Sequence, residues 1–143
     1  ITRGGAPIAT ATSAWALIDT ETRGLIRVDD FPLGLNILPK HDLELGRFIL
    51  PGEMQRVGIY TVGYGDIDRN RHMNNTKYPD MYSNFLPLDG KMIKSISIHY
   101  NNEAAIGEKL RVSRTNIGDT YFFRTLRGDG KINSEAQIEL ADI

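Results

Sequence analysis

Hydrophobic and polar residues alternate in a regular way from residue 56 to the end of the chain. Arg56 to Tyr64 carries apolar side chains at both odd and even positions, which indicates a largely buried strand. An apolar stripe with helical spacing then follows, formed by Tyr78, Met81, Tyr82 and Phe85. Pro87 and Gly90 mark where this helix ends. Four further runs have strand-like patterns, at 92–100, 109–115, 120–126 and 132–140.

The order of these elements predicts the fold class. One strand, one long helix and four strands follow each other, and tight turns at 116–119 and 128–131 join the later strands. Consecutive strands joined by short turns pair antiparallel. The pattern therefore predicts an α+β domain in which a curved antiparallel sheet wraps around the helix.

The chain before residue 56 is organised differently. Residues 8–18 and 25–28 are β-prone and flank a turn, so they predict a hairpin in which we expect Trp15 to be a core residue. Two strands are only marginally stable alone, and no helical pattern precedes Phe31 to cover them. Residues 31–52 are rich in proline and glycine, as in a linker between domains. We therefore expect the chain to be the remnant of a longer protein.

Composition limits the classes of function. The 143 residues carry a formal net charge of -1, which gives no general argument for binding nucleic acid or an anionic membrane. The chain has no cysteine, so a disulfide framework, a thiolate metal site and a cysteine nucleophile are excluded. This composition fits a reducing compartment, and we expect a cytoplasmic protein. No apolar run reaches the roughly 18 residues that a membrane span needs.

One polar loop, between the first strand and the helix, holds the groups most suited to proton chemistry. Asp68, Asn70 and His72 occupy alternate positions, which in an extended segment place their side chains on one face. Such a set can hold and deprotonate water or attack directly. Asn74 or Asn75 is a suitable N-cap for the helix, whose first N–H groups are candidate donors to an oxyanion. The loop therefore suits acyl transfer to water without a metal or a nucleotide, although turn formation and capping explain the same residues.

The loop also resembles a known family. The pattern Asp-x-Asn-x-His-x-Asn-Asn-x-x-Tyr, from Asp68 to Tyr78, is similar to that of the acyl-ACP thioesterases, including bacterial members, which are tandem hotdog proteins. Residues 11–19 and 21–28 look like the close of that family's first hotdog domain. The segment Tyr100-Asn101-Asn102-Glu103-Ala104 is similar to a downstream segment in which a Glu precedes a Cys in plant members.

The resemblance implies three parts and an activity. Residues 1–30 would be the C-terminal hairpin of a truncated first hotdog domain, 31–55 the linker, and 56–143 the catalytic hotdog domain. The implied reaction belongs to fatty acid biosynthesis: hydrolysis of the thioester that joins a fatty acyl chain to the phosphopantetheine of acyl carrier protein (ACP), the implied partner. No cofactor is implied.

The family's site residues carry over to individual positions. Asp68 would be the nucleophile or the base, Asn70 and His72 would orient and polarise the substrate, and Glu103 would support the site or activate water. The cysteine position is Ala104 here, which removes any thiol role. Two further groups complete the expected site, the substrate-binding residues Asn74, Asn75 and Tyr78, and the ACP-docking bases Arg69, Arg71 and Lys77. A solvated set of charges is the competing interpretation of these bases.

Two other functions compete with this one. Single-domain hotdog acyl-CoA thioesterases of the 4-hydroxybenzoyl-CoA-like group use similar Asp and His-x-Asn-Asn patterns, but they need only one hotdog and a homodimer. A non-catalytic hotdog module that binds acyl thioesters is the other alternative, and the intact set of Asp68, Asn70, His72 and Glu103 argues against it. The oligomeric state stays open.

Overall fold

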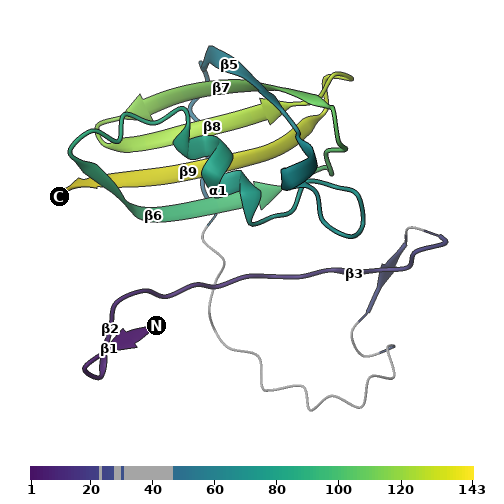
Figure 1. The fold of residues 1–143 in the computed structure, drawn as a ribbon, viewed down its shortest axis with the longest axis horizontal. Coiled ribbons are helices and arrows are strands. Elements are labelled where there is room, and N and C mark those ends of the chain that lie inside the picture. The colour runs from purple at the N-terminus through teal and green to yellow at the C-terminus, as the bar shows by residue number, and fades with distance from the viewer. Residues whose placement is uncertain (23, 28–29, 31–46) are drawn as a thin grey trace. The chain divides into compact units, whose positions relative to one another are not determined.

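The structure, a computed structural model, describes residues 1–22, 24–27, 30 and 47–143 (Figure 1). The chain divides into two compact units, Ile1–Arg47 and Phe48–Ile143, and each is considered by itself. Most of the predicted linker, 31–55, lies outside the described residues. The three predicted parts of the chain stay a prediction.

The first unit holds two small antiparallel hairpins among its described residues. Strand β1 (Thr2–Arg3) pairs with β2 (Ala6–Pro7), and β3 (Leu17–Ile18) pairs with β4 (Leu25–Ile26). The second hairpin lies where the sequence predicts one, but its strands are shorter because pairing stops after two residues. Trp15 lies before β3 and is 78% exposed, so its expected place in a core is wrong.

The second unit is built on one five-stranded antiparallel sheet with the order β5-β7-β8-β9-β6. Its strands match the five predicted runs within a few residues: β5 (Gln55–Thr61), β6 (Lys91–Tyr100), β7 (Lys109–Ile117), β8 (Thr120–Leu126) and β9 (Ile132–Asp142). The pairing shifts register in β5, in β6 and between Thr125 and Leu126. Such irregularities increase local twist and bend a sheet, so they help it to curve.

A single helix, α1 (Lys77–Ser83), lies across one face of this sheet (Figure 1). Tyr78, Met81 and Tyr82 of the predicted stripe are at most 2% exposed. The core cluster beneath them comes from every layer of the domain and includes Val62, Met73, Ala104, Leu110, Val112, Tyr121, Phe123, Ala136, Ile138 and Leu140. The predicted α+β arrangement of one helix on a curved antiparallel sheet is therefore present.

The helix differs from the prediction in length and in its cap. It ends at Ser83, and the chain continues to Leu86 through i→i+3 hydrogen bonds, such as that from Phe85 N–H to the carbonyl of Tyr82 at 2.9 Å. The tighter turns shorten the helix before Pro87. Thr76 is the N-cap, so the prediction of Asn74 or Asn75 at that position is wrong. Within the part of the chain that the structure describes, no helix has the length and apolar character to cross a membrane.

Gly58 of β5 is the point where the sheet approaches the end of the helical segment most closely. A Cβ built at this residue would lie 2.6 Å from Cε1 of the Phe85 ring. The Phe85 ring is partly buried and packs against the core cluster, and the Phe85 carbonyl accepts a hydrogen bond from the Arg114 guanidinium. A side chain at position 58 would therefore have to displace a packed ring whose backbone is also held.

We expect Gly58→Ala to lower the free energy of unfolding by about 1–3 kcal/mol, because it overpacks the contact with Phe85. Gly128→Ala is the matched control, since a Cβ there would meet no atom within 4 Å. Thermal and urea unfolding of the two variants measure the difference. Equal unfolding midpoints would contradict this account of Gly58.

Candidate active site

The polar loop that follows β5 is folded into a tight turn. The Asp68 N–H donates to the His72 carbonyl at 2.9 Å, and the Arg71 N–H donates to the Asp68 carbonyl at 3.0 Å. Ile67 and Met73 form an antiparallel bridge at the base of this turn. The Asp68 carboxylate accepts a hydrogen bond from the Asn70 N–H at 2.8 Å, which is how aspartate often stabilises turns.

This geometry corrects the extended segment expected from the sequence. Arg71 has a φ of 66°, in the left-handed region, so the backbone reverses between Asp68 and His72. Residues that face each other across a turn share one side of it. Asp68 and His72 are therefore neighbours across the turn, and Asn70 lies at its tip. The two residues come together because the backbone reverses, not because they alternate along an extended segment.

The turn lies against the segment that follows β6, and this contact brings two predicted site residues together. His72 and Ala105 form an antiparallel bridge, and the Met73 N–H donates to the Ala104 carbonyl at 2.8 Å. As a result, His72 Nδ1 lies 3.3 Å from Glu103 Oε2. The two side chains are 34% and 50% exposed, so a small molecule can reach them from solvent.

Ala104 is fully buried in the core cluster. The plant members that the sequence resembles carry cysteine at this position. A side chain in this place faces the core of the domain and not the solvent-accessible His72–Glu103 pair. The alanine is therefore compatible with a site that uses the neighbouring carboxylate.

Asn74 and Asn75 organise the turn before α1. The Asn74 carboxamide oxygen accepts hydrogen bonds from the N–H and the hydroxyl of Thr76, each at 2.9 Å. The Asn74 and Asn75 carbonyls accept the N–H groups of Lys77 and Tyr78. The first N–H groups of the helix are thus already used, so the expected oxyanion donors at the helix start are not free. A substrate role for either asparagine stays a prediction.

Tyr78 has a structural environment in this chain. It is 2% exposed, its hydroxyl accepts a hydrogen bond from Asn133 at 2.9 Å, and its ring packs edge-on against Tyr100. Burial raises the pKa of the Tyr78 hydroxyl. The Tyr100 hydroxyl in turn donates to the Asn75 carbonyl at 3.1 Å. Tyr78 therefore anchors the helix, and its predicted contact with substrate is not tested.

The three predicted docking bases lie at or near the surface. Arg69 and Arg71 are exposed at the turn, and Lys77 is half-buried with its Nζ 3.9 Å from Asp80 Oδ2. A surface ion pair at that distance contributes little to stability. The two arginines therefore remain the better candidates for contact with an acidic partner.

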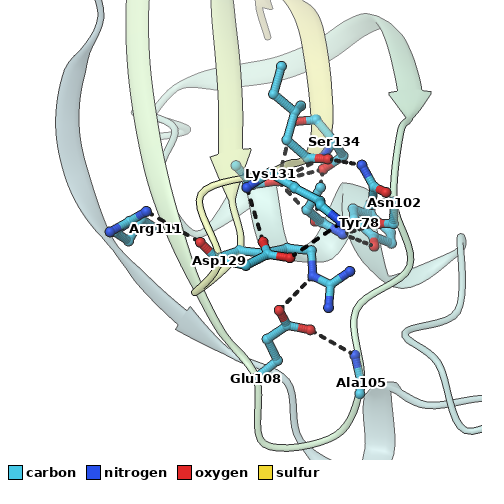
Figure 2. A network of polar contacts seen from close by, with 12 residues as sticks. Tyr78, Asn102, Ala105, Glu108, Arg111, Asp129, Lys131 and Ser134 are labelled. Carbon is cyan, nitrogen blue, oxygen red and sulfur yellow. Dashed lines mark hydrogen bonds and ion pairs between the residues drawn. The ribbon is translucent and has the colours of Figure 1, made fainter.

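Sequence analysis missed a carboxylate that holds the other end of the Glu103 segment. Glu108 Oε1 lies 2.7 Å from Arg127 Nε, and its Oε2 accepts the Ala105 N–H at 3.1 Å (Figure 2). The Glu108 carboxylate raises the pKa of Arg127 above its ordinary value. No motif marks these residues. The sequence indicates only that the two residues lie beside the ends of predicted strands, and many charged surface residues share that position.

Asp66, at the start of the polar loop, has a structural role. Its Oδ2 accepts hydrogen bonds from the Tyr60 hydroxyl at 2.9 Å and from the Gly63 N–H at 2.7 Å. Burial and the hydrogen bond to Asp66 raise the pKa of Tyr60 to about 12. Asp66 therefore fixes the start of the loop, and a catalytic role for Asp68 stays a prediction.

Comparison with known proteins gives a family match over most of the second unit. Residues 52–141 match the family model of the acyl-ACP thioesterase C-terminal domain. A comparison with curated protein sequences gives no match.

Solved structures support the same assignment at the level of fold. An acyl-ACP thioesterase from Bacteroides thetaiotaomicron aligns with a TM-score of 0.71 and 18% identity, over 87% of this chain and 53% of that chain. A 12:0-ACP thioesterase from Umbellularia californica aligns with a TM-score of 0.70 and 22% identity, over 88% and 53%. A hypothetical protein from Staphylococcus aureus, solved with CoA, gives 0.56 and 19%, over 64% and 77%.

These likenesses confirm the predicted α+β hotdog fold. The chain spans about half the length of the two thioesterases.

We expect Glu108→Gln to lower the free energy of unfolding by about 1–2 kcal/mol. This loss lies between those for exposed and buried ion pairs, because Glu108 and Arg127 are partly buried. Glu139→Gln is the control, since its carboxylate also lies 2.7 Å from its partner, Lys94, which is 60% exposed. Urea unfolding of both variants tests this, and equal losses would show that the Glu108 contact is an ordinary surface pair.

Proposed function

Because the chain belongs to the acyl-ACP thioesterase family, we propose that it forms the catalytic part of an enzyme that hydrolyses fatty acyl-ACP. Hydrolysis breaks the carbon–sulfur bond of the thioester, and the products are a free fatty acid and the phosphopantetheine thiol of ACP. The observation that supports this most directly is the contact of His72 Nδ1 with Glu103, beside Asp68 across the turn.

The geometry gives each of these residues a role in the proposal. Glu103 holds the His72 ring through Nδ1, so Nε2 is the nitrogen that we assign to the substrate. In this role His72 acts as the doubly protonated imidazolium paired with Glu103, so its Nε2–H polarises the thioester carbonyl and passes its proton to the leaving sulfur. The proton released from water during hydrolysis restores the imidazolium. Asp68 either attacks the carbonyl or deprotonates the attacking water, and Asn70, at the tip of the turn, orients the acyl group.

We expect Asp68→Ala and His72→Ala to lower kcat by about 10²–10⁴-fold, the usual loss when a catalytic acid or base is removed. Hydrolysis of a chain-length series of acyl-ACP and acyl-CoA by the protein measures this. His99→Ala is the matched control, because this histidine stacks on Phe48 with ring centroids 4.3 Å apart and has no place in the proposed site.

Three results separate the alternatives. Losses of only a few-fold at Asp68 and His72 contradict the assignment of the site. A preference for acyl-CoA contradicts the ACP substrate, and no turnover of either thioester supports a binding module. Incorporation of ¹⁸O into the Asp68 carboxylate during turnover in ¹⁸O-labelled water would identify Asp68 as the nucleophile, because a base acquires none.

We expect Arg69→Glu combined with Arg71→Glu to lower kcat/KM for acyl-ACP roughly 3- to 10-fold at low salt, because reversed charges at a rim mainly slow association with an acidic partner. The loss should shrink as ionic strength rises. Arg56→Glu is the control, since Arg56 is also exposed but lies on β5. A double variant that behaves like this control would show that the two arginines are only solvated.

A further inference from the structure

Asn133 of β9 is a fully buried carboxamide whose polar atoms are all used. Its Nδ2 donates to the Asn102 carbonyl at 2.6 Å and to the Tyr78 hydroxyl at 2.9 Å. Its Oδ1 accepts from the Thr125 hydroxyl at 2.9 Å. Burying an amide is costly unless such bonds form, so Nδ2 requires Asn102 and Tyr78 at their present places.

The backbone of Asn133 holds the same turn. Its carbonyl accepts the N–H groups of Asn101 at 2.9 Å and of Asn102 at 3.0 Å. The Asn102 carboxamide also donates to the Ile132 carbonyl at 2.7 Å. Figure 2 shows Asn102 beside Tyr78 and Ser134 within this network. The turn that immediately precedes Glu103 is therefore bound to the start of β9.

The carboxamide thus joins two segments that meet at the proposed site. Tyr78 belongs to α1, which follows the Asp68–His72 turn, and Asn102 directly precedes Glu103. The Met73–Ala104 hydrogen bond holds the backbone after Glu103, and the contacts of Asn102 hold the backbone before it. A shift of this turn by 1 Å is enough to cost a catalytic arrangement much of its efficiency.

We propose that Asn133 is a positioning residue, whose carboxamide fixes the Asn102 carbonyl against Tyr78 and so holds Glu103 in contact with His72. The proposal rests on the proposed thioesterase function. An amide suits this place because it offers two donors and one acceptor in one plane. Aspartate provides no donor when ionised, and leucine provides neither donor nor acceptor.

Asn133→Asp is the sharpest test. A carboxylate at this position still accepts from Thr125 and from the Tyr78 hydroxyl, so only the bond to the Asn102 carbonyl is replaced by repulsion between oxygens. We expect kcat to fall about 10-fold, with KM changed less than about 2-fold, because binding groups are untouched. Relative to wild type, kcat should recover as the pH falls from 8 to 5.5, since the neutral carboxyl group can donate to Asn102.

Thr125→Val is the matched control. Thr125 is as fully buried as Asn133 and belongs to the same network, but its hydroxyl bonds to Asn133 Oδ1 and Ser134 and not to Asn102. Without it, Asn133 Oδ1 still accepts from the Ser134 hydroxyl at 3.3 Å. We expect its kcat to stay within about 2-fold of wild type even where its melting temperature falls. Equal losses of kcat in Thr125→Val and Asn133→Asp, or no recovery at low pH, overturn the proposal.

A double-mutant cycle tests whether Asn133 acts through Glu103. In a Glu103→Gln background, Asn133→Asp should lower kcat less than about 2-fold, because the group that it positions has already lost its charge. If the losses of kcat from Glu103→Gln and Asn133→Asp multiply in the double variant, the proposal is overturned while the thioesterase function is left intact.

If the wild type hydrolyses no thioester, the proposed function fails, and the NMR amide signals of residues 101–105 decide the positioning role. These signals should shift in Asn133→Asp and not in Thr125→Val, and unchanged signals overturn it.

Discussion

The hydrogen bond between the Tyr82 hydroxyl and the Ser134 hydroxyl, 2.7 Å long, joins α1 to strand β9 of the sheet. Both residues are buried, and burial raises the pKa of the Tyr82 hydroxyl, which keeps it in the neutral form that this contact needs. Apolar packing alone allows a helix to slide on a sheet with little loss of energy. A buried polar contact does not, because each displaced hydroxyl would lose its partner without gaining water.

The candidate site inherits its geometry from that constraint. The helix is fixed in register by Tyr82 and Tyr78, so the turn before it is fixed as well, and Asp68 and His72 lie on the continuation of the same backbone. The Glu103 segment is held independently from the sheet side, at one end by Asn133 and at the other by Glu108. The site is therefore formed where two loops meet, each supported by buried polar contacts of the core.

The sequence was most informative where one physical rule dominated. Strand-like patterns predicted all five strands of the second unit, and helical spacing predicted the buried face of α1, because burial imposes these periods directly. The first strand was expected to be largely buried, and this is wrong, since β5 lies at the edge of the sheet and none of its residues is buried. The same rule failed in the loop. Asp68 and His72 share one side of the loop because the backbone reverses between them, not because the segment is extended. The Asp68 carboxylate and the left-handed Arg71 stabilise this reversal, and neither leaves a periodic pattern in the sequence. Glu108 and Asn133 were missed for a related reason, since their roles depend on partners far away in the chain.

Trp15 and Tyr64 show the opposite error. Both are large and apolar, and the sequence suggested core positions, yet they are 78% and 85% exposed. Strand β5 ends at Thr61, and Tyr64 already belongs to the short 3-10 helix η2 (Tyr64–Asp66), so the alternation that placed it inward no longer applies. Hydrophobic residues are common on protein surfaces, and a pattern cannot tell where an element stops.

Arg71 carries a cost that the rest of the domain must offset. Among the described residues it is the one non-glycine with a positive φ, a conformation that costs an L-residue roughly 1 kcal/mol or more. Glycine would remove this strain, but it would also let the backbone between Asp68 and His72 sample other shapes. The domain thus gives up some thermodynamic stability for a fixed loop shape, and selection for greater heat resistance at this position would act against selection for that shape.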